Sequence, residues 1–153
     1  MTPDFVNFPE LTGSDLELYY FMSPHKQIFE DFSAEVVKVH DGDTVTLRWS
    51  ERDFDFPLRF LNIAAPELKE KGGLASRDWL AGQIFGKTIE IKIDKDNRVG
   101  KFGRLLGKVE LGGIDVGQNS VMLGHSLPWD LRSDGKIQED IGNLEAAFKR
   151  VWS

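Results

Sequence analysis

The chain has 153 residues, of which 41 % are hydrophobic and 29 % are charged, a composition typical of one globular domain. It contains no cysteine, which excludes disulfides, thiolate metal sites and a cysteine nucleophile. The net charge of −6 argues against tight nucleic-acid binding through bulk electrostatics alone.

Residues 1–32 differ from the rest of the chain. They hold six acidic side chains against one lysine, together with seven aromatic residues. The remainder is therefore close to neutral and is compatible with a local basic face. We expect residues 1–32 to be an acidic, aromatic extension packed on the body, because so many aromatic rings are unfavourable in water. An arm that binds a protein partner is the alternative.

The sequence shows no membrane or export signal. No apolar run approaches the roughly 20 residues that cross a membrane, so we expect no membrane partner. The N-terminus starts without a basic segment or an apolar core, which argues against a secretory signal. The compartment is therefore unknown from the sequence, with a cytoplasmic location as the default expectation.

Three strands are predicted in the first half of the body. Residues 35–40 and 44–49 alternate between apolar and polar side chains, and the Asp-Gly pair at 41–42 between them is a strong hairpin signal. A third strand is predicted at 56–63, and Pro66 closes it.

Helices and strands follow one another in the second half. The predicted elements are a helix at 74–85, strands at 87–93 and 103–111, and helices at 116–123 and 137–152. Three strands, a helix and two strands match a five-stranded Greek-key barrel of the OB type. The predicted fold class is therefore α+β, mainly β, with about three helices.

Charged side chains lie near the ends of the predicted strands. Asp43 follows the hairpin turn, where its carboxylate can face a hard cation such as calcium or magnesium, whereas Asp41 is explained by the turn itself. Arg59 lies within an apolar strand, and a guanidinium taken out of water needs a partner. That partner is either a carboxylate, of Glu67 or Asp43, or the phosphate of a ligand, which arginine binds through two parallel hydrogen bonds.

Glu67 and Arg104 are each placed by a preceding residue. Glu67 follows Pro66, whose ring fixes the local backbone. Arg104 follows Gly103, which permits a ligand to approach the backbone at the start of a strand. Each feature alone favours a structural role. The three histidines have no ligand spacing, so zinc chemistry is not expected.

Taken together, these stretches resemble the staphylococcal nuclease (thermonuclease-like) family over roughly residues 33–153. The stretches that carry the resemblance are Val-His-Asp-Gly-Asp-Thr-Val at 39–45, Leu-Arg-Phe-Leu-Asn-Ile-Ala-Ala-Pro-Glu at 58–67, Gly-Lys-Thr-Ile at 86–89, Lys-Phe-Gly-Arg-Leu-Leu-Gly at 101–107 and Val-Met-Leu-Gly at 121–124. The first four of these motifs, in register, favour the same fold, with 1–32 outside it and 33–153 as the barrel domain.

The resemblance implies a calcium-assisted nuclease that hydrolyses phosphodiester bonds of single-stranded DNA or RNA. The family's metal-binding aspartate falls on Asp43, its two catalytic arginines on Arg59 and Arg104, and its catalytic glutamate on Glu67. In the implied chemistry the arginines stabilise the negative charge of the transition state and the glutamate positions or deprotonates the attacking water.

This sequence departs from the family pattern near the metal site. Ala64-Ala65 stand where the family has a second metal-binding aspartate and a threonine. The site is therefore expected to bind calcium more weakly, to recruit waters or Asp41, or not to bind the metal at all. Phe102 replaces a tyrosine, which keeps stacking on a base but loses a hydroxyl. We assign Phe102 and Lys101 to substrate binding, with Trp129 nearby as a further stacking residue.

Three functions follow from these observations. The first is an active nuclease with a depleted calcium site. The second is a catalytically inactive OB-type barrel that binds single-stranded nucleic acid or a protein. The third is an assembly protein that docks through residues 1–32.

Overall fold

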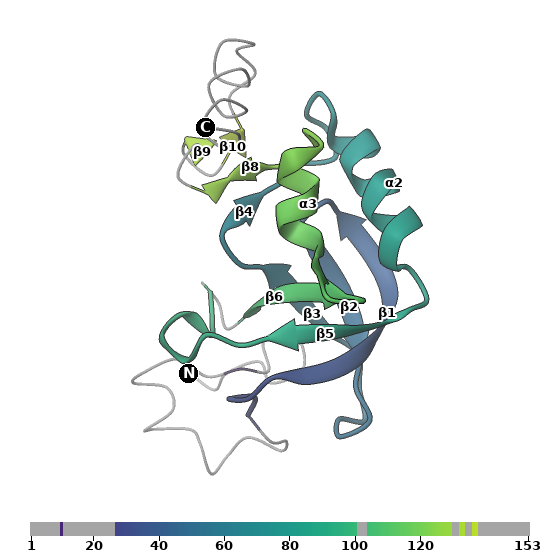
Figure 1. The fold of residues 1–153 in the computed structure, drawn as a ribbon, viewed down its shortest axis with the longest axis vertical. Helices are drawn as coiled ribbons and strands as arrows, with labels where there is room; N and C mark the ends of the chain where they lie inside the picture. The colour runs from purple at the N-terminus through teal and green to yellow at the C-terminus, as the bar shows by residue number, and fades with distance from the viewer. Residues whose placement is uncertain (1–9, 11–26, 101–103, 130–131, 134–135, 138–153) are drawn as a thin grey trace.

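The computed structural model describes residues 10, 27–100, 104–129, 132–133 and 136–137 (Figure 1). Its main feature is a sheet that closes into a barrel. The five barrel strands are β1 (Phe32–Asp41), β2 (Thr44–Arg48), β3 (Phe56–Phe60), β5 (Thr88–Lys92) and β6 (Leu105–Leu111), in the order β3-β2-β1-β5-β6. The predicted five-stranded barrel of mainly β class is therefore confirmed.

The barrel closes through one parallel pair. All other neighbouring strands are antiparallel, but β3 runs parallel to β6, with Leu58 beside Leu105 and Arg59 beside Leu106. Two register shifts in β1, one of them next to Asp41, increase its local twist. Such irregularities bend a strand enough to pair on both sides of a small barrel.

The third predicted strand is shorter than the sequence suggested. It ends at Phe60, because Asn62 has a left-handed backbone (φ 68°) that turns the chain. The chain then re-enters as β4 (Ile63–Ala64), which pairs with β8 (Leu127–Pro128) outside the barrel. The prediction of one continuous strand at 56–63 was therefore wrong.

Short elements complete the description. They are a 3₁₀ turn, η2 (Lys95–Asn97), and the two-residue strands β7 (Ile114–Asp115), β9 (Arg132–Ser133) and β10 (Lys136–Ile137). β7 pairs antiparallel with the end of β6, and β9 pairs with β10. Ile137 was predicted to start the last helix but belongs to β10.

Two helices were predicted to within about one residue. Helix α2 (Gly73–Ile84) packs against β1, and α3 (Val116–Met122) packs against β6 and β4 (Figure 1). Gly86, with φ 77°, follows α2 as predicted. The rest of the predicted helix at 137–152 lies outside the described residues. No helix in the described ranges is long and apolar enough to span a membrane.

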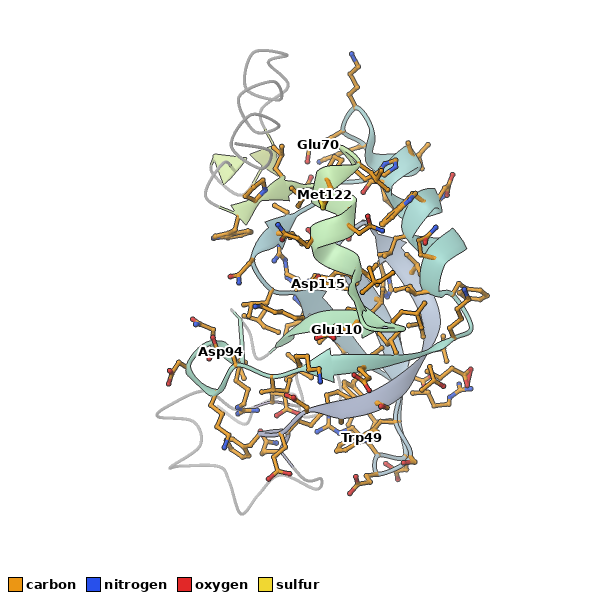
Figure 2. All side chains as sticks on the ribbon, viewed as in Figure 1. Trp49, Glu70, Asp94, Glu110, Asp115 and Met122 are labelled. Atoms are coloured by element: carbon orange, nitrogen blue, oxygen red, sulfur yellow. The ribbon has the colours of Figure 1, made fainter. Side chains whose placement is uncertain are left out.

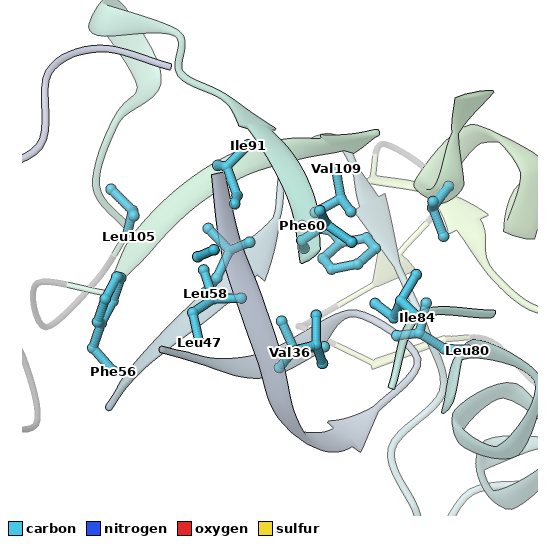
Figure 3. Packing of buried hydrophobic residues seen from close by; sticks show 14 of the residues in the cluster. Val36, Leu47, Phe56, Leu58, Phe60, Leu80, Ile84, Ile91, Leu105 and Val109 are labelled. Carbon is cyan, nitrogen blue, oxygen red and sulfur yellow. The ribbon is translucent and has the colours of Figure 1, made fainter. Parts of the chain in front are cut away.

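The core lies inside the barrel and beneath α2 (Figure 3). The alternation read in the sequence places every second strand residue inward. Its fully or almost fully buried members include Val36, Leu47, Phe56, Leu58, Phe60, Leu80, Ile84, Ile91, Leu105 and Val109. Arg59, between two of these positions, consequently points to the outer face of β3.

Part of the N-terminal extension contacts the barrel through a buried ion cluster. The Glu10 side chain is 0 % exposed and accepts hydrogen bonds from Arg52 Nη2 (2.7 Å) and from Arg98 Nη1. It also accepts from the backbone N–H of Ile28 (3.0 Å), which is itself buried. These contacts agree with packing of the extension on the body at two points, and the domain boundary itself stays a prediction.

Replacing Glu10 with alanine is expected to lower the free energy of unfolding by about 3–5 kcal/mol, because it leaves two buried guanidinium groups without this carboxylate. Chemical denaturation of both proteins measures the difference. Glu30→Ala removes an exposed carboxylate from the same extension and should change stability by less than about 0.5 kcal/mol. Equal stability of the Glu10 variant and wild type would contradict the buried cluster.

Candidate active site

The predicted hairpin turn holds Asp43 in a fixed position. The backbone N–H of Asp43 donates to Asp41 Oδ1 (3.0 Å), and the Thr44 hydroxyl donates to Asp43 Oδ1 (2.9 Å). Asp43 is only 5 % exposed. The turn chemistry assigned to Asp41 therefore also orients the carboxylate next to it.

The second oxygen of Asp43 joins two further segments. Asp43 Oδ2 accepts from the backbone N–H of Ala65 (2.8 Å) and from Arg59 Nη2 (3.2 Å). Thr44 pairs with Arg59 across β2 and β3, which explains why the guanidinium reaches this carboxylate. Of the two carboxylates considered from the sequence, the structure pairs Arg59 with Asp43.

A tryptophan covers the Arg59 guanidinium. The centre of the Trp129 ring lies 4.7 Å from the Arg59 guanidinium carbon. The backbone N–H of Trp129 donates to the carbonyl of Asn62 (3.1 Å). The ring is about half exposed. The sequence placed Trp129 near the site only as a stacking residue, and its contact with Arg59 depends on the β4–β8 pair.

Arg104 lies on the strand next to Arg59. It directly precedes β6, whose Leu106 is in register with Arg59 of the parallel strand β3. Because side chains alternate along a strand, Arg104 and Leu106 share the face of the sheet on which Arg59 lies. The strand spacings place the Arg59 and Arg104 Cα atoms about 8 Å apart, within reach of two arginine side chains toward one phosphate.

Glu67 lies close to the same edge, in a tight loop before α2. Its N–H donates to Glu70 Oε1 (2.9 Å), and its carbonyl accepts from the Glu70 N–H (2.9 Å). Gly73 packs so closely that an added Cβ would lie 2.0 Å from Glu67 O. The loop therefore fixes the Glu67 backbone two residues beyond the Ala65 amide that binds Asp43.

Lys101 and Phe102 lie outside the described residues, so their assignment to substrate binding stays a prediction. Of the other predicted site residues, Asp43 is hydrogen-bonded to both Asp41 and Arg59. Glu67 follows two residues after Ala65, whose N–H binds Asp43, and Arg104 directly precedes β6, which pairs with the strand of Arg59. The convergence of their side chains on one site stays a prediction.

Burial, together with the hydrogen bond and the negative charge of Asp43, raises the pKa of Asp41 to about 7. The Asp41 carboxyl is therefore partly protonated near neutral pH. This shows how closely the turn brings the two acids together.

Calcium usually takes six to eight oxygen ligands in proteins. Around Asp43 the structure places one further carboxylate, Asp41, while both Asp43 oxygens already accept hydrogen bonds. Within the described ranges, no group of three or more His, Cys, Asp or Glu side chains is placed to hold a metal ion. Ala64 is fully buried and contributes only a methyl group. These residues do not fit a tightly bound calcium ion.

Gly42 lets the Asp43 turn approach helix α2. An added Cβ would lie 1.9 Å from Ser76 Oγ and 2.7 Å from Ala65 Cβ. Gly42→Ala is therefore expected to displace the turn, to lower the free energy of unfolding by about 1–3 kcal/mol and to weaken any activity that depends on Asp43 and Arg59. Thermal unfolding and a nuclease assay measure the two effects.

Gly82→Ala is the matched control for that prediction. Nothing lies within 4 Å of a Cβ at Gly82, which is in the last turn of α2. The control should stabilise the protein by about 0.5–1 kcal/mol through helix propensity. If both variants behave alike, the close approach at Gly42 has no energetic consequence.

Comparison with known proteins finds nucleases. The chain is 30 % identical over 140 residues to a protein named "Uncharacterized endonuclease" from Escherichia coli O157:H7, covering 90 % of this chain and 87 % of that protein. It is 29 % identical over 113 residues to a "Micrococcal nuclease" from Shigella flexneri, covering 69 % of this chain and 62 % of that protein. No family model matches the chain.

Proposed function

This chain belongs to the staphylococcal nuclease-like family, and from that membership we propose that it hydrolyses phosphodiester bonds of single-stranded DNA or RNA. The observation that carries the proposal is the arrangement of Arg59 and Arg104. We infer that the two arginines face the same side of the β3–β6 pair, because Leu106, two residues after Arg104, is in register with Arg59, and that Glu67 lies at the same edge. This is the charge arrangement that a phosphodiester under attack requires.

Arg59 is the residue we assign to phosphate binding. Its side chain is mostly buried, and Asp43 and Trp129 hold the guanidinium from two sides. A guanidinium fixed in this way loses little side-chain entropy when a phosphate takes up its donors. Arg104 then adds a second positive charge from the neighbouring strand, where negative charge grows on the phosphate oxygens in the transition state.

We assign proton transfer to Glu67. A water molecule attacks the phosphorus atom, its proton passes to the Glu67 carboxylate, and the bond between phosphorus and the leaving oxygen breaks. The fixed loop of residues 67–73 supports this assignment, because a general base has to be held within hydrogen-bond reach of the water. The half-exposed Trp129 ring, with Phe102 and Lys101, is assigned to the bases and backbone of the single strand.

The residues around Asp43 offer few ligands for a calcium ion. Only Asp43 and Asp41 supply carboxylates, and no step of the proposed chemistry is drawn through the ion. We propose a depleted site at Asp43 that binds calcium weakly, on the order of 1 mM. The proposed enzyme therefore depends on its arginines and Glu67 more than on a resident cation.

Cleavage of a fluorescent single-stranded oligonucleotide tests the proposal, with calcium, magnesium or manganese each present at millimolar concentration. Arg104→Ala is expected to lower the rate by about 10²–10³-fold, the usual effect of removing one donor to a transition-state oxyanion. Arg77→Ala serves as the matched control and should retain the wild-type rate. It removes a half-buried arginine of α2 that forms an ion pair with its neighbour Asp78.

A wild-type protein that is inert with all three cations would overturn hydrolysis. Fluorescence anisotropy with the same oligonucleotide then identifies the alternative. Binding without cleavage would indicate the catalytically inactive OB-type module.

A further inference from the structure

We propose that Glu10 is a positioning residue for the active site, because it anchors Arg98 and thereby the strand pair that carries Arg104. This inference rests on the proposed function, since it gives Arg104 a role in hydrolysis. Glu10 belongs to the acidic N-terminal extension, which lies outside the motifs that carry the proposed nuclease site. The inference therefore assigns to that extension a contribution to the activity of the barrel.

The first step is the anchoring of Arg98. Its side chain is only 5 % exposed, and its Nη1 atom donates both to Glu10 Oε2 and to Ile28 O (2.8 Å). Its guanidinium carbon lies 4.3 Å from the Phe29 ring. Residues from two points of the extension therefore hold this one side chain in place.

The second step leads from Arg98 to Arg104 through the backbone. The Leu106 N–H donates to Arg98 O (2.9 Å), and the Gly100 N–H donates to Arg104 O (2.8 Å). Val99 and Leu105 form the bridge between these two bonds. The segments 98–100 and 104–106 are thus a short antiparallel pair, and Arg98 is its anchored end.

The third step concerns the position of Arg104 relative to Arg59. Arg59 is fixed in β3 by its contact with Asp43, whereas Arg104 precedes β6 and pairs with residues 98–100. A shift of that pair moves Arg104 more than Arg59, because Arg104 lies before the first residue of β6 that pairs with β3, whereas Arg59 is also held by Asp43. Because a misplacement of about 1 Å can lower a catalytic rate by about 100-fold, the anchor at Arg98 is able to influence turnover.

Arg52, the second arginine that binds Glu10, provides an internal control. Arg52 also binds Glu10, but it lies on the loop between β2 and β3, and its guanidinium carbon is 4.5 Å from the Phe56 ring. Figure 2 shows Trp49, which also packs near Arg52, at the opposite end of the molecule from Glu70 of the Glu67 loop. Removal of Arg52 therefore disturbs the cluster without touching the strand pair of Arg104.

The experiment compares Arg98→Met with Arg52→Met in the full chain. Each variant removes one arginine and leaves Glu10 bound to the other, so the loss of stability should be similar. We measure kcat and KM at a temperature at which both variants are folded. We also measure amide hydrogen exchange at Gly100 and Leu106, whose N–H groups join the two segments. Arg98→Lys replaces Arg98→Met if the latter does not fold.

The positioning role predicts an about 10-fold or larger fall in kcat for Arg98→Met, with little change in KM, and faster exchange at Gly100 and Leu106. Arg52→Met should keep the wild-type kcat and exchange rates. In an Arg104→Ala background, Arg98→Met should cause no further fall in kcat, because both changes act through the same side chain.

Equal kcat and equal exchange in the two variants would overturn the inference and leave the cluster a purely structural one. An inert wild-type protein would overturn the proposed function instead. In that case the exchange measurement still decides whether Arg98 holds the strand pair: selective protection loss in Arg98→Met supports the anchor, and its absence overturns it.

Discussion

Replacing Glu67 with glutamine is expected to lower kcat for a single-stranded oligonucleotide by about 10²–10⁴-fold, the usual contribution of a general base. Glutamine preserves the size of the side chain but cannot accept the proton of the attacking water. The loop geometry should survive, because the backbone groups of Glu67, and not its carboxylate, make the bonds to Glu70. We therefore expect the free energy of unfolding, measured by thermal denaturation, to change by less than about 0.5 kcal/mol.

Glu70→Gln is the matched control for this prediction. It removes a charge from the same loop but keeps a side-chain oxygen that can accept the Glu67 N–H. Rates measured with both variants at saturating oligonucleotide should fall for the Glu67 variant alone. If the two variants lose activity equally, the loop contributes through its charge or its shape, and the assignment of Glu67 as the base fails.

Replacing Ala64 with aspartate is expected to have the second large effect, on stability and on calcium binding together. Ala64 is fully buried in β4, next to the Ala65 amide that binds Asp43. A new carboxylate there lacks water, and burial of an uncompensated charge costs several kcal/mol. In calcium-free buffer we therefore expect a clear fall in Tm, by about 2–4 °C for each kcal/mol lost.

Calcium should reverse that loss in the variant. An ion that binds only the folded protein stabilises it by about 2.7 kcal/mol at 100 times its Kd. Differential scanning calorimetry of the variant at several calcium concentrations should therefore show a rising Tm, while wild type shows little change at 1 mM. Ala64→Asn, which has the same shape without the charge, should not respond.

Two results would contradict this account of the depleted site. An equally large calcium response of the wild-type protein would mean that Asp43 and Asp41 already suffice. A variant whose Tm does not rise with calcium would mean that position 64 does not face the cation. A gain of nuclease activity in the variant would show in addition that Arg59, Glu67 and Arg104 are competent.

The barrel could be predicted because its signals are local. The alternation in β1 and β2 and the Asp-Gly turn between them specify a hairpin without reference to the rest of the chain. The need of Arg59 for a partner was equally visible, since a guanidinium does not enter an apolar strand alone. Which carboxylate serves depends on the pairing of Thr44 with Arg59, which no local pattern reveals.

Long-range contacts could not be predicted in this way. Glu10 is 42 residues from Arg52 and 88 residues from Arg98, and nothing in the extension identifies Glu10 among its six acidic residues. The one signal that existed was Arg52 itself, which is placed among aromatic residues that later pack on its guanidinium. The break at Asn62 was missed for a related reason, because one asparagine in an apolar run is a weak turn signal.

The parallel pair of β3 and β6 also has a consequence for the order of folding. It joins Leu58 to Leu105, residues far apart in the chain, and such contacts form late because the intervening chain must first lose conformational entropy. The hairpin of β1 and β2 has no such delay. Arg59 belongs to β3 and Arg104 directly precedes β6, so the two arginines are brought together only when this pair forms. A partly folded or newly synthesised chain therefore has no assembled arginine pair, and the proposed hydrolysis is confined to molecules that have completed the barrel.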